Sequence, residues 1–126
     1  MNDPDGLVRE FCEAWSKKNP DLLTDYFTEN GVYHNMPMQA LEGREAIRGF
    51  LTGFLSGVDT AEFRILHQVA SGDVVMNERV DVFRTTEGRE GAFPVAGIFE
   101  IREGKIAAWR DYFDMAQVTA FLTGQS

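Results

Sequence analysis

The sequence has little of what several classes of function require. It contains one cysteine and two histidines, with no HxH, HExxH or CxxC spacing, so an internal disulfide is excluded and no metal site is predicted. It has 12 Lys and Arg against 20 Asp and Glu, a formal charge of −8. No basic run offers a surface for nucleic acid or for an anionic membrane, and neither is predicted as a partner.

Long hydrophobic runs and phosphate-binding loops are also missing. No segment approaches the roughly 20 apolar residues of a membrane-spanning helix, and the polar, acidic start MNDPDGLVRE is unlike a signal peptide. These features predict a cytoplasmic protein. The sequence has no GxGxxG, P-loop or GxSxG motif, which argues against nucleotide binding and against α/β-hydrolase chemistry.

What the chain does have is material for one apolar core. Hydrophobic residues make up 44% of its 126 residues and aromatic residues 12%, which predicts a single domain over 1–126. Helical spacing of apolar residues predicts helices from Pro4 to Asn19, over 20–27 and over 43–55. Asn30-Gly31 predicts a turn, followed by a short strand at Val32–Met36.

After residue 58 the pattern changes to the alternation of strands. Four strands and a closing helix are predicted over 61–70, 73–85, 91–101, 105–113 and 114–122. Helices followed by a strand meander predict an α+β fold, with the N-terminal helices covering one side of a curved sheet.

The segment AAWRDYFDM, residues 107–115, places a carboxylate among large apolar side chains. Alternate strand residues share a face, so Trp109, Asp111, Phe113 and Met115 point the same way. Burying an unpaired charge is costly. We therefore expect Asp111 to be either paired or retained for chemistry.

A turn centred on Gly88 brings two more charges to this face. It predicts Arg79 opposite Gly97 and Asp81 opposite Val95. The odd-numbered face of the strand at 91–101 contains only apolar residues and glycine, which makes it an interior. Gly97 leaves room beside Arg79 for a guanidinium or a ligand.

A three-residue turn at 102–104 predicts Asp111 opposite Val95, at the level of Asp81. The two backbones would then lie about 10 Å apart, a gap that inward-leaning side chains and a long arginine can span. A two-residue turn, Glu103-Gly104, would move Asp111 to the opposite face.

An Asp–Arg–Asp group in an apolar pocket has two interpretations. One is a structural ion network. The other is a catalytic site, because two carboxylates that share one cation can be driven to different pKa values and act as acid and base.

Three segments, VYHNMP, NERVDVF and GKIAAWRDYFD, carry a resemblance along nearly the whole chain. In this order and spacing they resemble the limonene-1,2-epoxide hydrolase family, within the SnoaL-like and NTF2-like superfamily. The resemblance implies a cone-shaped NTF2-like (cystatin-like) α+β fold with a curved mixed sheet, a deep apolar pocket and a homodimeric assembly. It also implies one-step hydrolysis of a small apolar epoxide by water to a vicinal diol, with no cofactor and no covalent intermediate.

The resemblance assigns a role to each of five residues. Asp111 matches the base that takes a proton from water, and Tyr33 and Asn35 match the residues that position that water. Asp81 matches the acid that protonates the epoxide oxygen. Arg79 matches the residue that bridges the two carboxylates and contacts this oxygen.

Other functions stay open. A SnoaL-like cyclase or an isomerase uses one base, which leaves the group of Arg79, Asp81 and Asp111 unexplained; a non-catalytic binder of small apolar molecules would use the charges only to orient a polar end. His67 is predicted to be a structural histidine, with a place in the pocket as the alternative, and His34 to lie at the surface or an interface.

Overall fold

The structure, a computed structural model, describes residues 3–124, which form helices packed on a six-stranded sheet of order β2-β1-β6-β5-β4-β3. The elements are α1 (Pro4–Ala14), the 3-10 helix η1 (Trp15–Lys17), α2 (Pro20–Thr24), β1 (Phe27–Asn35), β2 (Leu41–Glu42), α3 (Arg44–Ser56), β3 (Val58–Ser71), β4 (Val74–Thr85), β5 (Glu90–Arg102), β6 (Lys105–Tyr112) and α4 (Met115–Thr123). Strands β1 and β6 are parallel and the other neighbours antiparallel, so the sheet is mixed.

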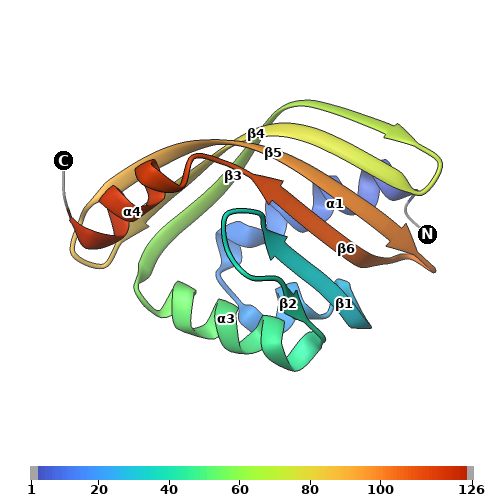
Figure 1. Cartoon of the computed structure of the whole chain (residues 1–126), viewed down its shortest axis with the longest axis horizontal. Helices are drawn as coiled ribbons and strands as arrows, with labels where there is room; N and C mark the ends of the chain where they lie inside the picture. The colour runs from blue at the N-terminus through green and yellow to red at the C-terminus, as the bar shows by residue number, and fades with distance from the viewer. Residues whose placement is uncertain (1–2, 125–126) are drawn as a thin grey trace.

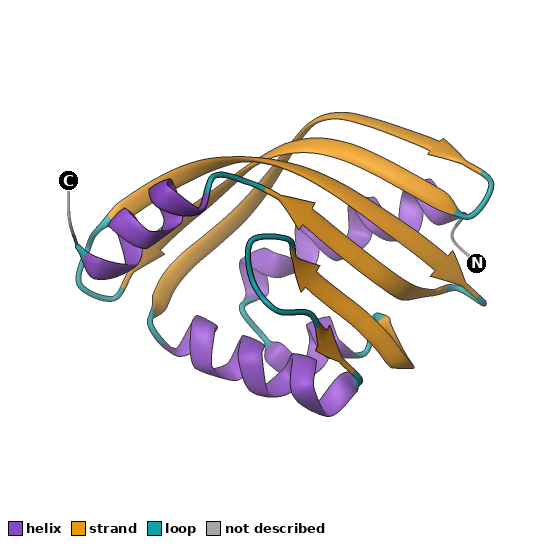
Figure 2. Ribbon diagram, viewed as in Figure 1, coloured by secondary structure: helices purple, strands orange, loops and turns teal. Residues whose placement is uncertain are grey.

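The sheet is curved and does not close on itself. Figure 1 shows α1 and α3 along its concave side and α4 near the end opposite to the N-terminus. Figure 2 shows the same separation into a layer of helices and a layer of strands. The predicted α+β architecture, with N-terminal helices packed on a curved mixed sheet, is confirmed. None of the helices within residues 3–124 is long and apolar enough to cross a membrane.

Local sequence explains where the first helices begin. Asp3 caps α1 by accepting a hydrogen bond from the amide of Gly6 at 2.7 Å. Asn19 caps α2 in the same way, accepting from the amides of Asp21 and Leu22 at 3.1 and 3.2 Å. Side-chain acceptors at these positions satisfy amides that have no partner inside the helix.

Two predictions for the N-terminal half are wrong. The second helix ends at Thr24 instead of residue 27, and Asn30-Gly31 lies inside β1, where the register breaks between Phe27 and Val32. Phe27 is fully buried and pairs with β6, so tertiary packing outweighs the local preference for a helix and a turn. The two-residue strand β2 is too short to leave an alternation pattern in the sequence.

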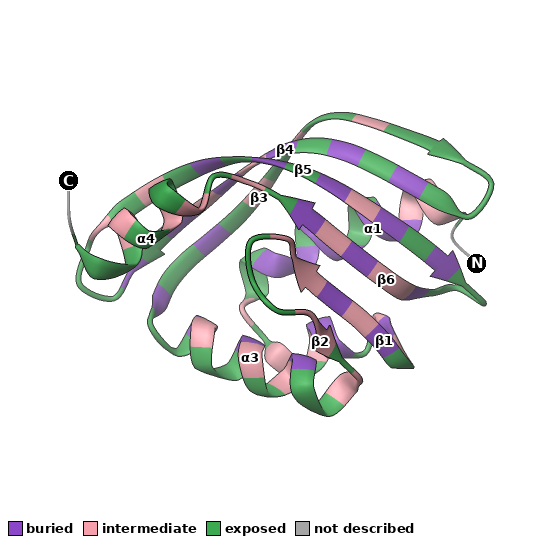
Figure 3. Ribbon diagram, in the orientation of Figure 1, coloured by how far each residue is buried: buried purple, intermediate pink, exposed green. Residues whose placement is uncertain are grey.

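The first predicted hairpin is displaced by two residues. Arg79 pairs with Val95 and Asp81 with Phe93. A shift of two residues preserves the face of every side chain, because the side-chain period of a strand is two. The predicted interior face is therefore confirmed, and Figure 3 shows buried and exposed residues alternating along β4 and β5.

The second hairpin reaches the predicted face by another route. Its turn is the two-residue Glu103-Gly104, with positive φ angles of 51° and 76°, which by itself would put Asp111 outside. A bulge at Ala107 adds one unpaired residue to β6 and restores the alternation. Asp111 thus lies inside, opposite Gly97.

Stacked rings attach β1 to β6 beneath the cavity. The indole of Trp109 stacks on Tyr33 with ring centroids 4.3 Å apart and planes 5° apart. Phe11 of α1 packs edge-on against Trp109 at 5.0 Å. This aromatic core holds the parallel strand pair in place, and three predicted site residues lie on that pair: Tyr33, Asn35 and Asp111.

Candidate active site

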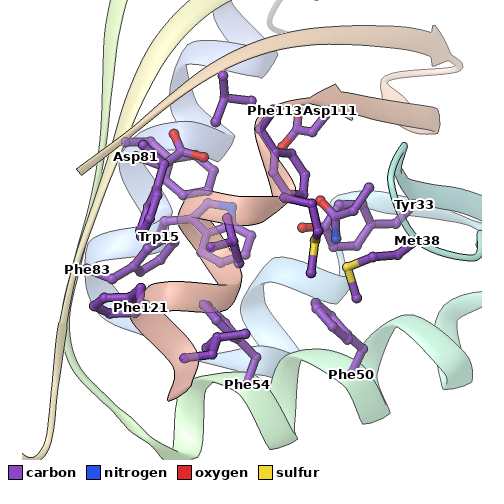
Figure 4. A pocket seen from close by; sticks show the side chains of 17 residues that line it. Trp15, Tyr33, Met38, Phe50, Phe54, Asp81, Phe83, Asp111, Phe113 and Phe121 are labelled. Carbon is purple, nitrogen blue, oxygen red and sulfur yellow. The ribbon is translucent and has the colours of Figure 1, made fainter. Parts of the chain in front are cut away.

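A cavity of about 140 Å³ opens between the concave face of the sheet, α3 and α4. Its walls are mostly aromatic and aliphatic (Figure 4). Four of the predicted site residues line it: Tyr33, Asn35, Asp81 and Asp111. The fifth, Arg79, is fully buried behind the two carboxylates.

All five N–H groups of the Arg79 guanidinium have acceptors. Nε and Nη2 donate to the two oxygens of Asp81 at 3.0 and 2.9 Å. Nη1 and Nη2 donate to the two oxygens of Asp111 at 3.2 and 2.8 Å. The remaining Nη1 hydrogen goes to Oδ1 of Asn77 at 3.1 Å.

This saturation differs from one expectation of the resemblance. Because every donor of Arg79 is engaged and its side chain does not line the cavity, no N–H is left for an epoxide oxygen. Arg79 is placed to position the two aspartates, while Asp81 is the group that reaches the cavity.

Gly97 makes this arrangement possible. A Cβ at this position would lie 2.5 Å from Nη1 of Arg79 and 2.8 Å from Oδ1 of Asp111. The predicted space beside Arg79 is therefore present, and the guanidinium fills it.

Asn77 was missed as a site residue by sequence reasoning. It shares the inward face of β4 with Arg79, and its Nδ2 donates to Oε1 of Gln68 at 3.0 Å. Gln68 in turn donates to the carboxylate and the carbonyl oxygen of Asp5 in α1, at 2.8 and 3.1 Å. The signal that could have identified Asn77 is that it is a third polar residue, beside Arg79 and Asp81, on the inward face of the same strand.

Asp111 has a second partner besides Arg79. The indole N–H of Trp109, two residues earlier on β6, donates to Oδ1 of Asp111 at 2.6 Å. Three hydrogen bonds, each using an oxygen lone pair, thus hold the Asp111 carboxylate as an acceptor in an apolar wall.

Asn35 is the register partner of Asp111 in the parallel pair of β1 and β6, and Tyr33 lies two residues before it. Burial raises the pKa of the Tyr33 hydroxyl far above its usual value, and the charge of Asp111 adds to this, although the hydrogen bond with Asn35 acts in the opposite direction. Tyr33 therefore stays a neutral phenol that both donates and accepts hydrogen bonds.

The other two ionisable groups of the cluster, Arg79 and Asp81, differ in protonation. Burial opposes the charge of Arg79, but the carboxylates of Asp111 and Asp81 outweigh it and hold the pKa of Arg79 well above its usual value. Burial raises the pKa of Asp81 to about 6; Arg79 lowers it, and the charge of Asp111 raises it further. A proton on Asp81 leaves the cluster neutral, which removes the cost of an uncompensated buried charge.

The remaining reactive side chains lie elsewhere. A bulge between Ile65 and His67 places His67 on the outer surface, 83% exposed and hydrogen-bonded to Glu78 at 2.9 Å, so the alternative place in the pocket is wrong. His34 is half-buried and bonded to the carbonyl of Met38. Within residues 3–124, no group of three or more His, Cys, Asp or Glu could hold a metal ion.

Comparison with known proteins shows the family of this chain. The SnoaL-like domain profile matches residues 8–109. Epoxide hydrolase EphG of Mycobacterium tuberculosis is 30% identical over 108 residues, which cover 86% of this chain and 71% of EphG.

Solved structures show the same fold. An M. tuberculosis LEH-like epoxide hydrolase is 28% identical, with a TM-score of 0.79 over 94% of this chain and 88% of that chain. A Catenulispora acidiphila protein with a ketosteroid isomerase-like fold, solved with trimethylamine, is 24% identical, with a TM-score of 0.82 over 95% and 93% of the two chains. The profile match and the relationship to EphG show that this chain belongs to the SnoaL-like domain family, whose members similar to it include epoxide hydrolases.

Proposed function

We propose that the protein is a cofactor-independent epoxide hydrolase that adds water to a small apolar epoxide, cyclic or terpene-like, and forms a vicinal diol in one step. The observation that carries the proposal is the group of Arg79, Asp81 and Asp111, which we call the clamp. One guanidinium holds two carboxylates that both line an apolar cavity, and one of them has a pKa near neutrality.

The nucleophile is a water molecule. Tyr33 and Asn35 hold it by hydrogen bonds, and Asp111 accepts its proton as the water oxygen bonds to an epoxide carbon. Fixing water and epoxide together replaces a bimolecular encounter with a positioned one, which lowers the entropic part of the barrier.

The leaving oxygen is protonated by Asp81. As the carbon–oxygen bond of the epoxide breaks, Asp81 transfers its proton to that oxygen, so no alkoxide forms. One proton has moved to Asp111 and one has left Asp81, and the net charge of the site is unchanged. A proton then returns from Asp111 to Asp81 before the next turnover. Positioned proton transfer contributes about 10²–10⁴-fold for each group.

The relatives support the same reaction. EphG and the solved LEH-like structure, both from M. tuberculosis, are epoxide hydrolases by name, at 30% and 28% identity. A cyclase or an isomerase on this fold would need one base and no water-holding pair, and a binder would need neither the neutral acid nor the saturated arginine.

The assembly and the location of the protein are proposals too. We expect a homodimer, as the family resemblance implies, and a cytoplasmic location. Light scattering of the purified protein tests the first, since a monomeric mass contradicts it, and cell fractionation tests the second.

Oxygen labelling tests the reaction. The protein, in molar excess over limonene oxide or cyclohexene oxide, is incubated with the epoxide in ¹⁸O water. The diol from this single turnover is analysed by mass spectrometry. We expect one labelled oxygen in that diol. Unlabelled protein oxygen in the first turnover would show attack by a carboxylate, and the absence of any diol would leave the cyclase or the binder.

A further inference from the structure

Trp15 has a polar atom that the proposed reaction does not use. It is the first residue of η1, is 1% exposed and lines the cavity. Its indole N–H is the one buried side-chain N or O atom within residues 3–124 that has no hydrogen-bond partner. Leaving a buried donor without an acceptor is unfavourable and rare in folded proteins, so the group calls for an explanation.

The ring of Trp15 is held in a fixed orientation. It stacks on Phe63 with centroids 4.4 Å apart and planes 17° apart, and it packs edge-on against Trp109 at 5.9 Å. It therefore cannot rotate freely to find a partner elsewhere. Figure 4 shows Trp15, with its blue nitrogen, among the side chains that surround the cavity.

The other tryptophan of the chain shows the contrast. Trp109 donates its indole hydrogen to Asp111 at 2.6 Å, within the charged cluster. Trp15 lies next to that cluster but outside it, since Phe63 contacts both the Trp15 ring and the guanidinium carbon of Arg79, which lies 4.7 Å from the Phe63 centroid. The two indole N–H groups thus differ: that of Trp109 is engaged by Asp111, and that of Trp15, which lines the cavity, has no partner.

We infer that the Trp15 N–H is a second polar recognition point of the cavity, for a ligand that carries a hydrogen-bond acceptor. On the proposed function, the substrate class becomes an epoxide with a further carbonyl, ether or hydroxyl oxygen. The aspartates bind the epoxide group, and Trp15 donates to the second oxygen. Trp15 touches substrate but takes part in no proton transfer.

The acceptor needs a small adjustment of the wall. The nitrogen is covered by neighbouring side chains, so a wall side chain changes rotamer when the ligand enters, as is common on binding. Binding then relieves the unmet donor. A gain of 1.4 kcal/mol is tenfold in affinity, so we expect the cavity to prefer an oxygenated ligand over a hydrocarbon of the same shape by about tenfold.

A matched ligand pair tests this without any turnover. Limonene and 4-acetyl-1-methylcyclohexene differ only by a C=O in place of a C=CH₂ group, and neither contains an epoxide. The chain has two indole N–H signals in a ¹⁵N NMR spectrum, assigned with Trp15→Phe. We expect the acetyl compound to bind about tenfold tighter than limonene and to move the Trp15 signal downfield.

Two variants guard against a packing effect. Trp15→Phe removes the donor but also leaves space, so Trp15→3-benzothienylalanine, which replaces the N–H by sulfur and retains both rings, is measured beside it. Both should bind the two ligands with equal affinity. An unmoved Trp15 signal, or a preference for the acetyl compound that survives in the sulfur variant, overturns the inference.

The epoxides of the same two compounds separate this inference from the proposed function. Diol formation with equal kcat/KM for both in the native protein sustains the hydrolase and overturns the role of Trp15. A Trp15-dependent binding preference without any diol sustains the recognition point and overturns the hydrolase.

Discussion

Arg79 and Asp111 meet across Gly97, the residue of β5 that lies between their strands. Nη2 of Arg79 donates to Oδ2 of Asp111 at 2.8 Å, although β4 and β6 are not neighbours. The guanidinium occupies the space where a β5 side chain would stand, because a Cβ at Gly97 would lie 2.5 Å from Nη1. Because Gly97 has no side chain, Arg79 and Asp111 can form an ion pair across β5.

Gly97→Ala should therefore separate the clamp. The added methyl displaces both Arg79 and Asp111, so we expect kcat/KM for epoxide hydrolysis to fall by at least about 10²-fold, since small misplacements of reacting groups have effects of this size. Overpacking should also lower the free energy of unfolding by about 1–3 kcal/mol.

Gly49→Ala is the matched control, because a Cβ at this position in α3 meets nothing within 4 Å. It should leave kcat/KM unchanged and stabilise slightly. Native activity in Gly97→Ala would show that the clamp is not needed for turnover.

Asp111→Asn tests the base. An amide cannot accept the proton of the water, so diol formation should drop by at least about 10²-fold. Both carboxylate oxygens accept hydrogen bonds from Arg79, so the NH₂ group must face a donor, and the melting temperature should fall as well. Circular dichroism verifies that the variant is folded, and a folded variant with more than about a tenth of native kcat/KM would exclude Asp111 as base.

The role of Asp81 as the acid predicts that both kcat/KM and the free energy of unfolding depend on pH. Burial raises the pKa of Asp81 to about 6, and its proton is lost as the pH rises through that value, so kcat/KM should decline there. Because the usual value is 3.8, the folded protein binds this proton more tightly than the unfolded chain, and the free energy of unfolding should also decrease from about pH 4 to above pH 6.

Initial rates and urea titrations across this range measure both effects. Asp81→Asn should flatten the decrease in stability, because it removes the titrating group. A kcat/KM that rises through pH 6 would mean that Asp81 acts in its ionised form.

Variants of Asn77 and Gln68 should reduce kcat to different extents, because only Asn77 contacts Arg79 directly. Asn77→Leu removes the acceptor of one Arg79 hydrogen bond and should lower kcat by about tenfold, with the alkaline limb of the pH profile displaced, because Arg79 can shift relative to Asp81. Gln68→Leu retains that acceptor and removes only the link to α1, so its effect should be smaller. Equal loss in both variants with an unmoved pH limb would indicate a merely structural role.

The sequence by itself determined which residues face the interior. Alternation is a local property of a strand, so Arg79 and Asp81 could be placed on one face of their strand before any pairing was known, and the structure buries both. The prediction that Asp111 shares this face depended in addition on the length of the turn before its strand. Alternation likewise places Tyr33 and Asn35 on one face of β1. The family resemblance added their roles, which stay predictions.

Only the tertiary structure decided how these residues meet. Both hairpins were predicted with a register two residues away from the observed one, because register depends on the exact length of the loop and on bulges. The bulge at Ala107 returned Asp111 to the interior after a turn that would have excluded it. No local pattern predicts such a compensation.

The partners of the buried polar groups were also decided at this level. Arg79 is saturated because Asn77, Asp81 and Asp111 converge on it from β4 and β6, and Trp15 is left without an acceptor because its ring is fixed between side chains from β3 and β6. A hydrogen bond needs two groups in contact, and contacts between distant segments follow from the assembled sheet and helices, whereas the face of a side chain follows from its own strand.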